Sequence, residues 1–200
     1  MKRLIDRVYF QELSEQNPME VCTRALCSYD NANKFYTVSL WGEGYRIYPH
    51  QFRIECIGKN PQRFHSYFEL FIVHYLLKVK EIEASSQWIS EKDITEGMTF
   101  FRGPHAIPTN LISTRFDSDM EGFNNRCEEL KGIPVSLADA AYIFEITPRI
   151  PVAVLYWRGD DEFPTESKIL YDKTIVRHFA SDIIYALAVG ICERLAKPMS

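Results

Sequence analysis

The sequence predicts an α+β fold in which a mainly antiparallel sheet packs on a central buried helix and a C-terminal amphipathic helix, all in a single domain over residues 1–200. Three observations predict it. Runs with strand character, joined by short turns, occur in both halves of the chain. A stretch that is apolar nearly all round lies between them, and the end of the chain has an apolar stripe at helical spacing. With 46% hydrophobic and 14% aromatic residues, the chain can build a core for such a domain.

The first part of the chain predicts one short helix followed by three strands. Asn17 before Pro18 is typical of a helix N-cap with proline in the first turn, and we expect this helix to reach about Cys27. Alternating apolar residues follow, and a glycine-containing turn at 42–44 predicts a hairpin. The expected strands cover 34–41, 45–48 and 52–57.

The middle of the chain predicts mostly helix. Phe64–Val79 is apolar nearly all round, which indicates the central buried helix. Ser90 and Asp93 have the spacing of a capping box. A helix is expected over 111–130, in one or two pieces, because Gly132 follows it as a C-terminal glycine should.

The last part predicts strands and then a long helix. Two apolar runs, 141–146 and 151–157, are joined by a short turn and indicate a second hairpin, with a further strand over 168–171. Asp172 is expected to cap a last helix that runs to about Ala196. Its apolar stripe consists of Ile175, Phe179, Ile183, Leu187 and Ile191.

Charge and hydropathy limit the function. The 27 acidic and 23 basic side chains give a formal net charge of −4, which argues against nucleic-acid or anionic-membrane partners, because these need clustered Lys and Arg. The longest uncharged apolar run, 183–192, is about half of the roughly 20 residues of a spanning helix. No apolar signal-peptide core follows Met1. We therefore expect a cytoplasmic protein.

The cysteines agree with that location. Five is an odd number, and no CxxC pair occurs, so neither a zinc ribbon nor a thioredoxin-like motif is present. Cys22 and Cys27 lie about 140° apart if both belong to one helix. The sequence favours reduced thiols buried as small apolar groups.

The segment Asp117–Glu128 allows two interpretations. Its acidic residues fall at positions 1, 3, 5 and 12, with glycine at position 6, which is the spacing of a calcium-binding EF-hand loop. However, Asn124 occupies a position that is usually apolar, and Glu121 is long for its ligand position. Ser118 and Glu121 also fit the capping box of a helix, and a helix and an ion loop cannot share this stretch. We favour the helix.

A second acidic cluster follows the last predicted hairpin. Its carboxylates, together with Asp172, could hold a hard cation such as Mg²⁺ or pair an acid of raised pKa with an ionised base. Trp157 and Phe163 flank the cluster, as aromatic walls flank small-molecule pockets. The alternative is an exposed acidic turn with Asp172 as a helix cap. The cluster consists of Asp160, Asp161 and Glu162.

The histidines form no metal-ligand motif. His74 lies in the apolar helix and is expected to be a satisfied core histidine. His105 lies in a predicted loop, so it is the best candidate for a ligand-facing imidazole, for example an axial ligand to a haem or corrinoid. No nucleophile motif and no phosphate-binding loop is present. The sequence therefore assigns no catalytic residue, metal or cofactor.

The stretch W-x-G-D-x-E-F-P at 157–164, followed by Ile169-Leu170-Tyr171-Asp172 and preceded by Trp88-Ile89-Ser90, resembles a family of uncharacterised proteins from anaerobic bacteria and archaea, known only as a domain of unknown function. The resemblance covers most of the chain. It implies an association with corrinoid and one-carbon metabolism. Some relatives carry an added iron–sulfur-type segment, which this sequence lacks. The resemblance supplies no catalytic residues.

These observations lead to three hypotheses. The first is a cytosolic small-ligand-binding or accessory module that holds a small molecule or docks a protein partner, linked by the resemblance to corrinoid or tetrapyrrole metabolism. The second is a carboxylate- or divalent-metal-dependent enzyme of the hydrolase type. The third is a structural protein–protein interaction subunit. The candidate ligand-binding residues are Trp157, Asp160, Asp161, Glu162, Asp172, His105 and Trp88.

Overall fold

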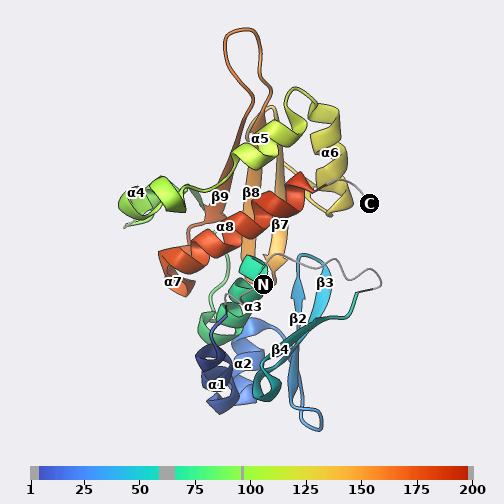
Figure 1. The fold of residues 1–200 in the computed structure, drawn as a ribbon, viewed down its shortest axis with the longest axis vertical. Helices are drawn as coiled ribbons and strands as arrows, with labels where there is room; N and C mark the ends of the chain where they lie inside the picture. The colour runs from blue at the N-terminus through green and yellow to red at the C-terminus, as the bar shows by residue number, and fades with distance from the viewer. Residues whose placement is uncertain (1–4, 59–65, 96, 198–200) are drawn as a thin grey trace.

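The computed structural model describes residues 5–58, 66–95 and 97–197 and has an α+β fold, as predicted. Its strands form two antiparallel sheets (Figure 1). The first has the order β1-β2-β3-β4 and the second the order β5-β9-β8-β7-β6. The strands of the first are β1 (Ser28–Asp30), β2 (Phe35–Leu40), β3 (Glu43–Tyr48) and β4 (Arg53–Cys56). Those of the second are β5 (Trp88–Ile89), β6 (Ile133–Pro134), β7 (Ala140–Thr147), β8 (Ile150–Trp157) and β9 (Glu166–Asp172).

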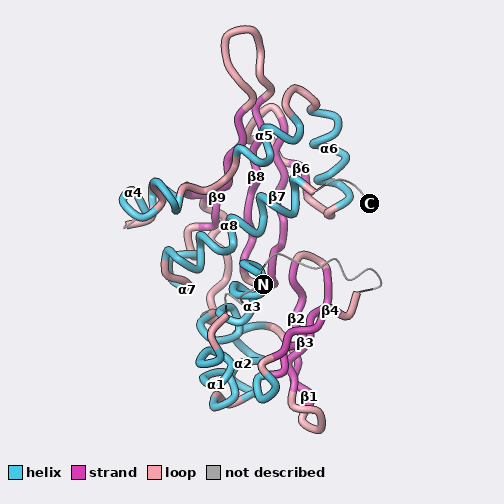
Figure 2. Tube along the Cα trace, in the orientation of Figure 1, coloured by secondary structure: helices cyan, strands magenta, loops and turns pink. Residues whose placement is uncertain are grey.

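Helices pack around both sheets (Figure 2). The long ones include α3, the predicted central helix, whose predicted start at residue 64 lies outside the described residues. The α-helices are α1 (Arg7–Glu15), α2 (Pro18–Ala25), α3 (Ser66–Lys78), α4 (Gly97–Phe100), α5 (Asn110–Phe116), α6 (Met120–Glu129), α7 (Ile175–His178) and α8 (Ser181–Ala196). Short 3-10 helices cover Pro49–Gln51, Glu91–Asp93 and Gly103–His105. Within the described ranges, no helix combines the length and apolar character that crossing a bilayer requires.

One hydrophobic core joins the two sheets through α3 and α8. Both helices are buried along most of their length, and α8 crosses one face of the five-stranded sheet (Figure 1). Their close approach depends on Gly190, because a Cβ added there would lie 2.7 Å from the ring of Phe68. The opposite face of that sheet carries a small second cluster around Ala153 and Leu155, against which Trp88 and Trp157 pack.

The helical interpretation of 111–130 is confirmed as two helices, α5 and α6. Asp117 ends the first with a positive φ of 41°, and Asp119 begins the second by accepting a hydrogen bond from the Gly122 amide. The cap is therefore Asp119 and not Ser118. Because α6 starts at Met120, these residues do not form a twelve-residue ion loop, and the described residues contain no cluster of three or more potential metal ligands.

Sequence reasoning missed the first helix, and its expectation for the last helix was wrong. The sequence did not predict α1, although Asp6 caps it by accepting a hydrogen bond from the Val8 amide. The last helix is not continuous from Asp172, because Phe179 and Ala180 have extended backbone conformations that separate α7 from α8. Asp172 does not cap either helix. Its carboxylate instead binds the loop at Ser85 and Ser86.

Candidate functional site

A pocket of about 540 Å³ lies where α3 ends and where α7 and α8 begin. The extended residues between α7 and α8 separate the two helices, so the first turn of α8 borders the pocket. Its chemically active lining comes from three segments of the chain. These residues are His74, Lys78, Lys80, Arg177, His178 and Asp182.

His178 is held in a single tautomer. Its Nδ1 accepts a hydrogen bond of 3.1 Å from the backbone amide of Lys80, so this nitrogen carries no proton. Burial lowers the pKa of His178 to about 4, assisted by the positive charges of Lys80, Arg149 and Arg177. The ring is therefore neutral at pH 7 and carries its proton on Nε2. That buried N–H has no acceptor among the described residues.

His74 supplies a second buried imidazole on the facing helix. Only 8% of the residue is exposed, and its Nε2 also has no hydrogen-bond partner in the described parts of the chain. Burial lowers its pKa, with Asp182 opposing and Lys78 assisting the shift. The predicted core position of His74 is confirmed, but the prediction that this histidine is satisfied was wrong, since Nε2 lacks a partner among the described residues. Buried polar groups are nearly always hydrogen-bonded, so two such atoms in side chains that line the same pocket favour an external partner.

The charges around the pocket favour an anion. Lys78, Lys80 and Arg177 are exposed, and Asp182 is the one carboxylate among the described lining residues. The first turn of α8 adds its helix dipole, which attracts negative charge. Positive charge is thus concentrated here in a protein whose formal net charge is −4.

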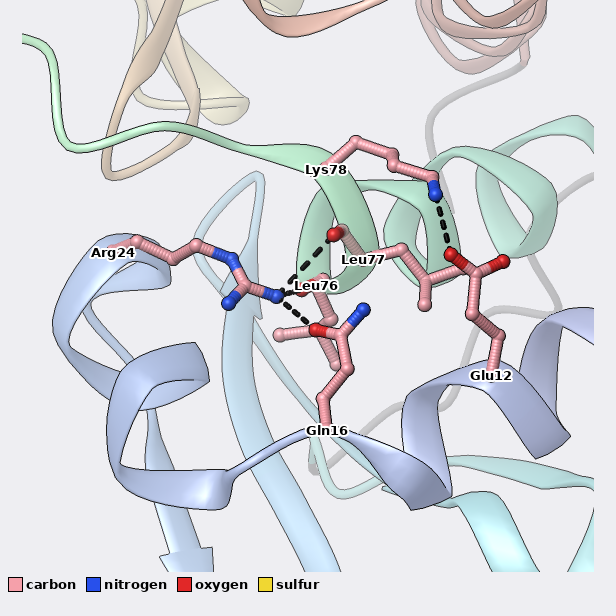
Figure 3. Close-up of polar contacts among 6 residues, drawn as sticks. All are labelled: Glu12, Gln16, Arg24, Leu76, Leu77 and Lys78. Atoms are coloured by element: carbon pink, nitrogen blue, oxygen red, sulfur yellow. Dashed lines mark hydrogen bonds and ion pairs between the residues drawn. The ribbon is translucent and has the colours of Figure 1, made fainter.

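Contacts with α1 and α2 fix the end of α3 that borders the pocket (Figure 3). The guanidinium of Arg24 donates hydrogen bonds to the carbonyl oxygens of Leu76 (2.6 Å) and Leu77 (3.3 Å), which the helix leaves unpaired. It also binds the side chain of Gln16. Lys78 forms an ion pair with Glu12 of α1. The pocket therefore has a rigid base on its α3 side.

The stability of the protein is expected to depend on pH through His178. Its pKa is about 4 in the folded protein and 6.5 in its ordinary state, so the unfolded chain binds a proton first as the pH falls. The contribution is complete above about pH 6.5 and is lost progressively towards pH 4. Urea unfolding of His178→Gln should show a flatter pH dependence between pH 4 and 6.5 than the unchanged protein. An equal dependence in both proteins would contradict this assignment.

The acidic turn predicted from the sequence lies at the opposite end of the sheet. The connection between β8 and β9 projects beyond the strands (Figure 1). Asp160 accepts hydrogen bonds from the amides of Glu162 (2.9 Å) and Phe163 (2.8 Å), which lower its pKa. Asp161 and Glu162 are exposed, and Trp157 is half-buried on the open face of the sheet. A shallow polar pocket of about 630 Å³ adjoins the turn and includes Asp161 but not Glu162.

Asp172 cannot share a site with this turn. Trp157 pairs with Glu166 at one end of β9, and Trp88 pairs with Asp172 at the other. The two ends of β9 are six residue steps apart, or about 20 Å at the usual rise per residue. One cation bridges oxygens at only about 2–2.6 Å each, so the shared-cation interpretation was wrong.

The remaining candidates lie apart as well. The exposed ring of His105 stacks on Phe100, with centroids 4.7 Å apart and planes at 12°, and contacts the edge of Tyr185 on α8. Trp88 and Trp157 pack instead on the open face of the sheet, against the small cluster of Ala153 and Leu155.

Sequence reasoning missed most of the basic pocket. Lys80, Arg177 and His178 carry no recognisable motif, and His178 was expected inside a continuous helix. The one available signal was His74 in an otherwise apolar helix, next to the positive residue Lys78. Tertiary contacts between residues 98 positions apart, as between Lys80 and His178, form the site.

The fold and the pocket define a two-sheet α+β protein with a basic cavity between its helices. A family described as Domain of unknown function (DUF3786) matches residues 17–194, so the chain belongs to this family. The matched region includes both sheets, α3 and the pocket. Comparisons with curated proteins and with solved structures gave no match.

Proposed function

We propose that the protein is a small-ligand-binding module whose basic pocket takes a small molecule with a phosphate or carboxylate group. The observation that carries the proposal is the buried Nε2–H of His178, which has no acceptor among the described residues, in a side chain that lines a pocket together with Lys78, Lys80 and Arg177. An oxyanion would accept a hydrogen bond from this N–H and would also interact with the positive charges of Lys80 and Arg177. Hydrogen bonds to a charged acceptor are stronger than neutral ones.

Chemistry distinguishes the proposal from its alternatives. A carboxylate-dependent hydrolase or a divalent-metal enzyme would need free carboxylate oxygens close together, but Asp160 and Asp172 lie at opposite ends of β9 and bind backbone amides. A purely structural interaction subunit would leave the His74 and His178 nitrogens without a role. These alternatives therefore have less support than ligand binding.

Several features of the protein's setting belong to the same proposal. A cytoplasmic location is supported by the odd number of cysteines, all of them free, because cytoplasmic thiols are kept reduced. An anaerobic source and a link to corrinoid, tetrapyrrole or one-carbon metabolism are supported by the resemblance of the 157–164 stretch. A corrinoid bound through the exposed His105 would give a visible absorbance band in protein purified without oxygen. That band would be unaffected by changes in the basic pocket.

Inorganic phosphate is expected to stabilise the protein. The double variant Lys80→Ala/Arg177→Ala should weaken phosphate binding about tenfold, since each exposed charge–oxyanion contact contributes up to about 1 kcal/mol. Calorimetric titration at fixed ionic strength measures the affinity, with citrate as a carboxylate probe. Both substituted side chains are exposed, so the variant should fold normally.

The matched control is Arg158→Ala, which removes a cation beside the acidic turn at the far end of the sheet. It should bind phosphate as the unchanged protein does. The absence of binding by either probe, or an equal loss of affinity in the control, would overturn the proposal.

A further inference from the structure

We propose that Cys22 and Cys27 form a reversible intramolecular disulfide, a modification site separate from the basic pocket. Their Sγ atoms lie 3.9 Å apart, with the Cys27 thiol directed at Cys22. Both residues are partly exposed, so a small oxidant can reach them. Neither residue lines the pocket, so the proposal stands or falls independently of the proposed function.

The backbone brings the two thiols together. Helix α2 ends at Ala25, and Leu26 has a left-handed conformation with φ of 49°. The amide of Cys27 then donates a hydrogen bond of 3.2 Å to the carbonyl oxygen of Cys22. This is the Schellman termination of a helix, in which the side chains at these two positions typically make a hydrophobic contact. Here both positions hold cysteine, so the contact is between two thiols.

This geometry differs from the sequence-based expectation. On a continuous helix Cys22 and Cys27 would point about 140° apart. The left-handed residue between them reverses the chain, which a non-glycine residue rarely allows. The interpretation of these cysteines as unrelated buried groups was therefore based on the wrong backbone conformation.

The other three cysteines do not offer the same chemistry. Cys127 and Cys192 are fully buried in the core, and burial raises the pKa of both thiols. Cys56 is partly exposed on β4, but its neighbour is the hydroxyl of Tyr45 and not a second thiol. The pair at 22 and 27 is the one thiol–thiol contact among the described residues.

The reaction is an ordinary thiol–disulfide exchange with a small-molecule disulfide such as oxidised glutathione. The thiolate of Cys22 attacks one sulfur of the oxidant, forms a mixed disulfide and releases one glutathione thiolate. The Sγ of Cys27 then loses its proton, attacks the Sγ of Cys22 and releases the second glutathione. Two protein thiols are oxidised and one glutathione disulfide is reduced to two thiols. Burial and the neighbouring Cys22 raise the pKa of Cys27, so Cys22 should react first.

The test equilibrates the full chain in glutathione redox buffers and follows it by intact mass, thiol counting and peptide mapping. We expect a product lighter by two hydrogen atoms, in which the number of titratable thiols falls from five to three and the linked peptides contain Cys22 and Cys27. Reduction with dithiothreitol should restore all five titratable thiols.

Two variants distinguish a specific disulfide between Cys22 and Cys27 from non-specific oxidation of other cysteines. Cys27→Ser should accumulate the glutathione adduct at Cys22, while Cys56→Ser should close the disulfide as the unchanged protein does. A protein that keeps five thiols in oxidising buffer overturns the proposal, as does a linkage that involves Cys56. The thiol count and the linkage are measured first on the unchanged protein. The proposal can therefore be tested even if one of the variants fails to fold.

Discussion

Replacing Asp172 with alanine is expected to lower the free energy of unfolding by about 3–5 kcal/mol, which is the range for removing one partner of a buried charged network. Asp172 is 2% exposed. Its Oδ1 accepts hydrogen bonds from the amides and hydroxyls of both Ser85 and Thr174, and its Oδ2 accepts from the amide of Ser86. Alanine would leave these donors without an acceptor inside the protein.

Asparagine at the same position should have a smaller effect. Asp172→Asn keeps an oxygen at the Oδ1 position but directs an amide group at the Ser86 N–H, so we expect a loss of about 1.5–3 kcal/mol. The matched control is Asp160→Ala, which removes an acidic residue of an exposed turn and should have a much smaller effect than Asp172→Ala. Urea unfolding of the three variants measures the differences. A loss below 1 kcal/mol in Asp172→Ala would show that this carboxylate does not hold the loop.

The same network predicts an acid dependence. Burial alone would raise the pKa of Asp172, but the hydrogen bonds from Thr174 and Ser85 outweigh it and lower the pKa. Since the folded protein holds its proton more weakly than the unfolded chain, this stabilisation is complete above about pH 3.8 and is lost as the pH falls further. The stabilisation that depends on His178 is lost at higher pH, so during acid unfolding it disappears before the stabilisation that depends on Asp172.

Asp172 also shows what sequence patterns can and cannot predict. An aspartate shortly before a helix is a good N-cap signal, and the strand that ends at Asp172 was correctly predicted because its apolar periodicity is local. The helix predicted after it is in fact divided into α7 and α8. Thr174 is a local partner of Asp172, but Ser85 and Ser86 are more than 80 positions away. The fold class was therefore predictable, whereas the role of this carboxylate depends on tertiary contacts.

The candidate site shows the same division. His74 was visible as a histidine in an apolar helix, but the unpartnered Nε2 of His178 follows only from its bond to the Lys80 amide. The acidic turn attracted attention because neighbouring charges are easy to see in a sequence. Asp160, however, uses its carboxylate to close its own turn. Local sequence patterns thus identified the acidic turn. They could not identify the basic pocket, because it forms only where three segments of the chain meet in the fold.

Gly190→Val should destabilise the protein by about 3 kcal/mol, because over-packing a well-filled core forces side chains and backbone to shift. A Cβ at this position would lie 2.7 Å from Cδ1 of Phe68 and 2.8 Å from Cε1 and Cγ, closer than carbon atoms can approach. Phe68 is itself 1% exposed and cannot move into solvent. Glycine is otherwise a poor helix former, so its presence inside α8 indicates that the close contact with α3 is needed.

A double-mutant cycle with Phe68→Ala tests this explanation. The single change Phe68→Ala should cost about 3–5 kcal/mol by leaving a cavity, but in combination with Gly190→Val the new side chain fills part of that space. The double variant should therefore lose less stability than the sum of the two single changes. If the losses in the free energy of unfolding are additive, the introduced valine does not destabilise the protein through its contact with Phe68. Because His74 of α3 and Asp182 of α8 both line the basic pocket, Gly190→Val should also weaken phosphate binding, even at temperatures where the variant remains folded.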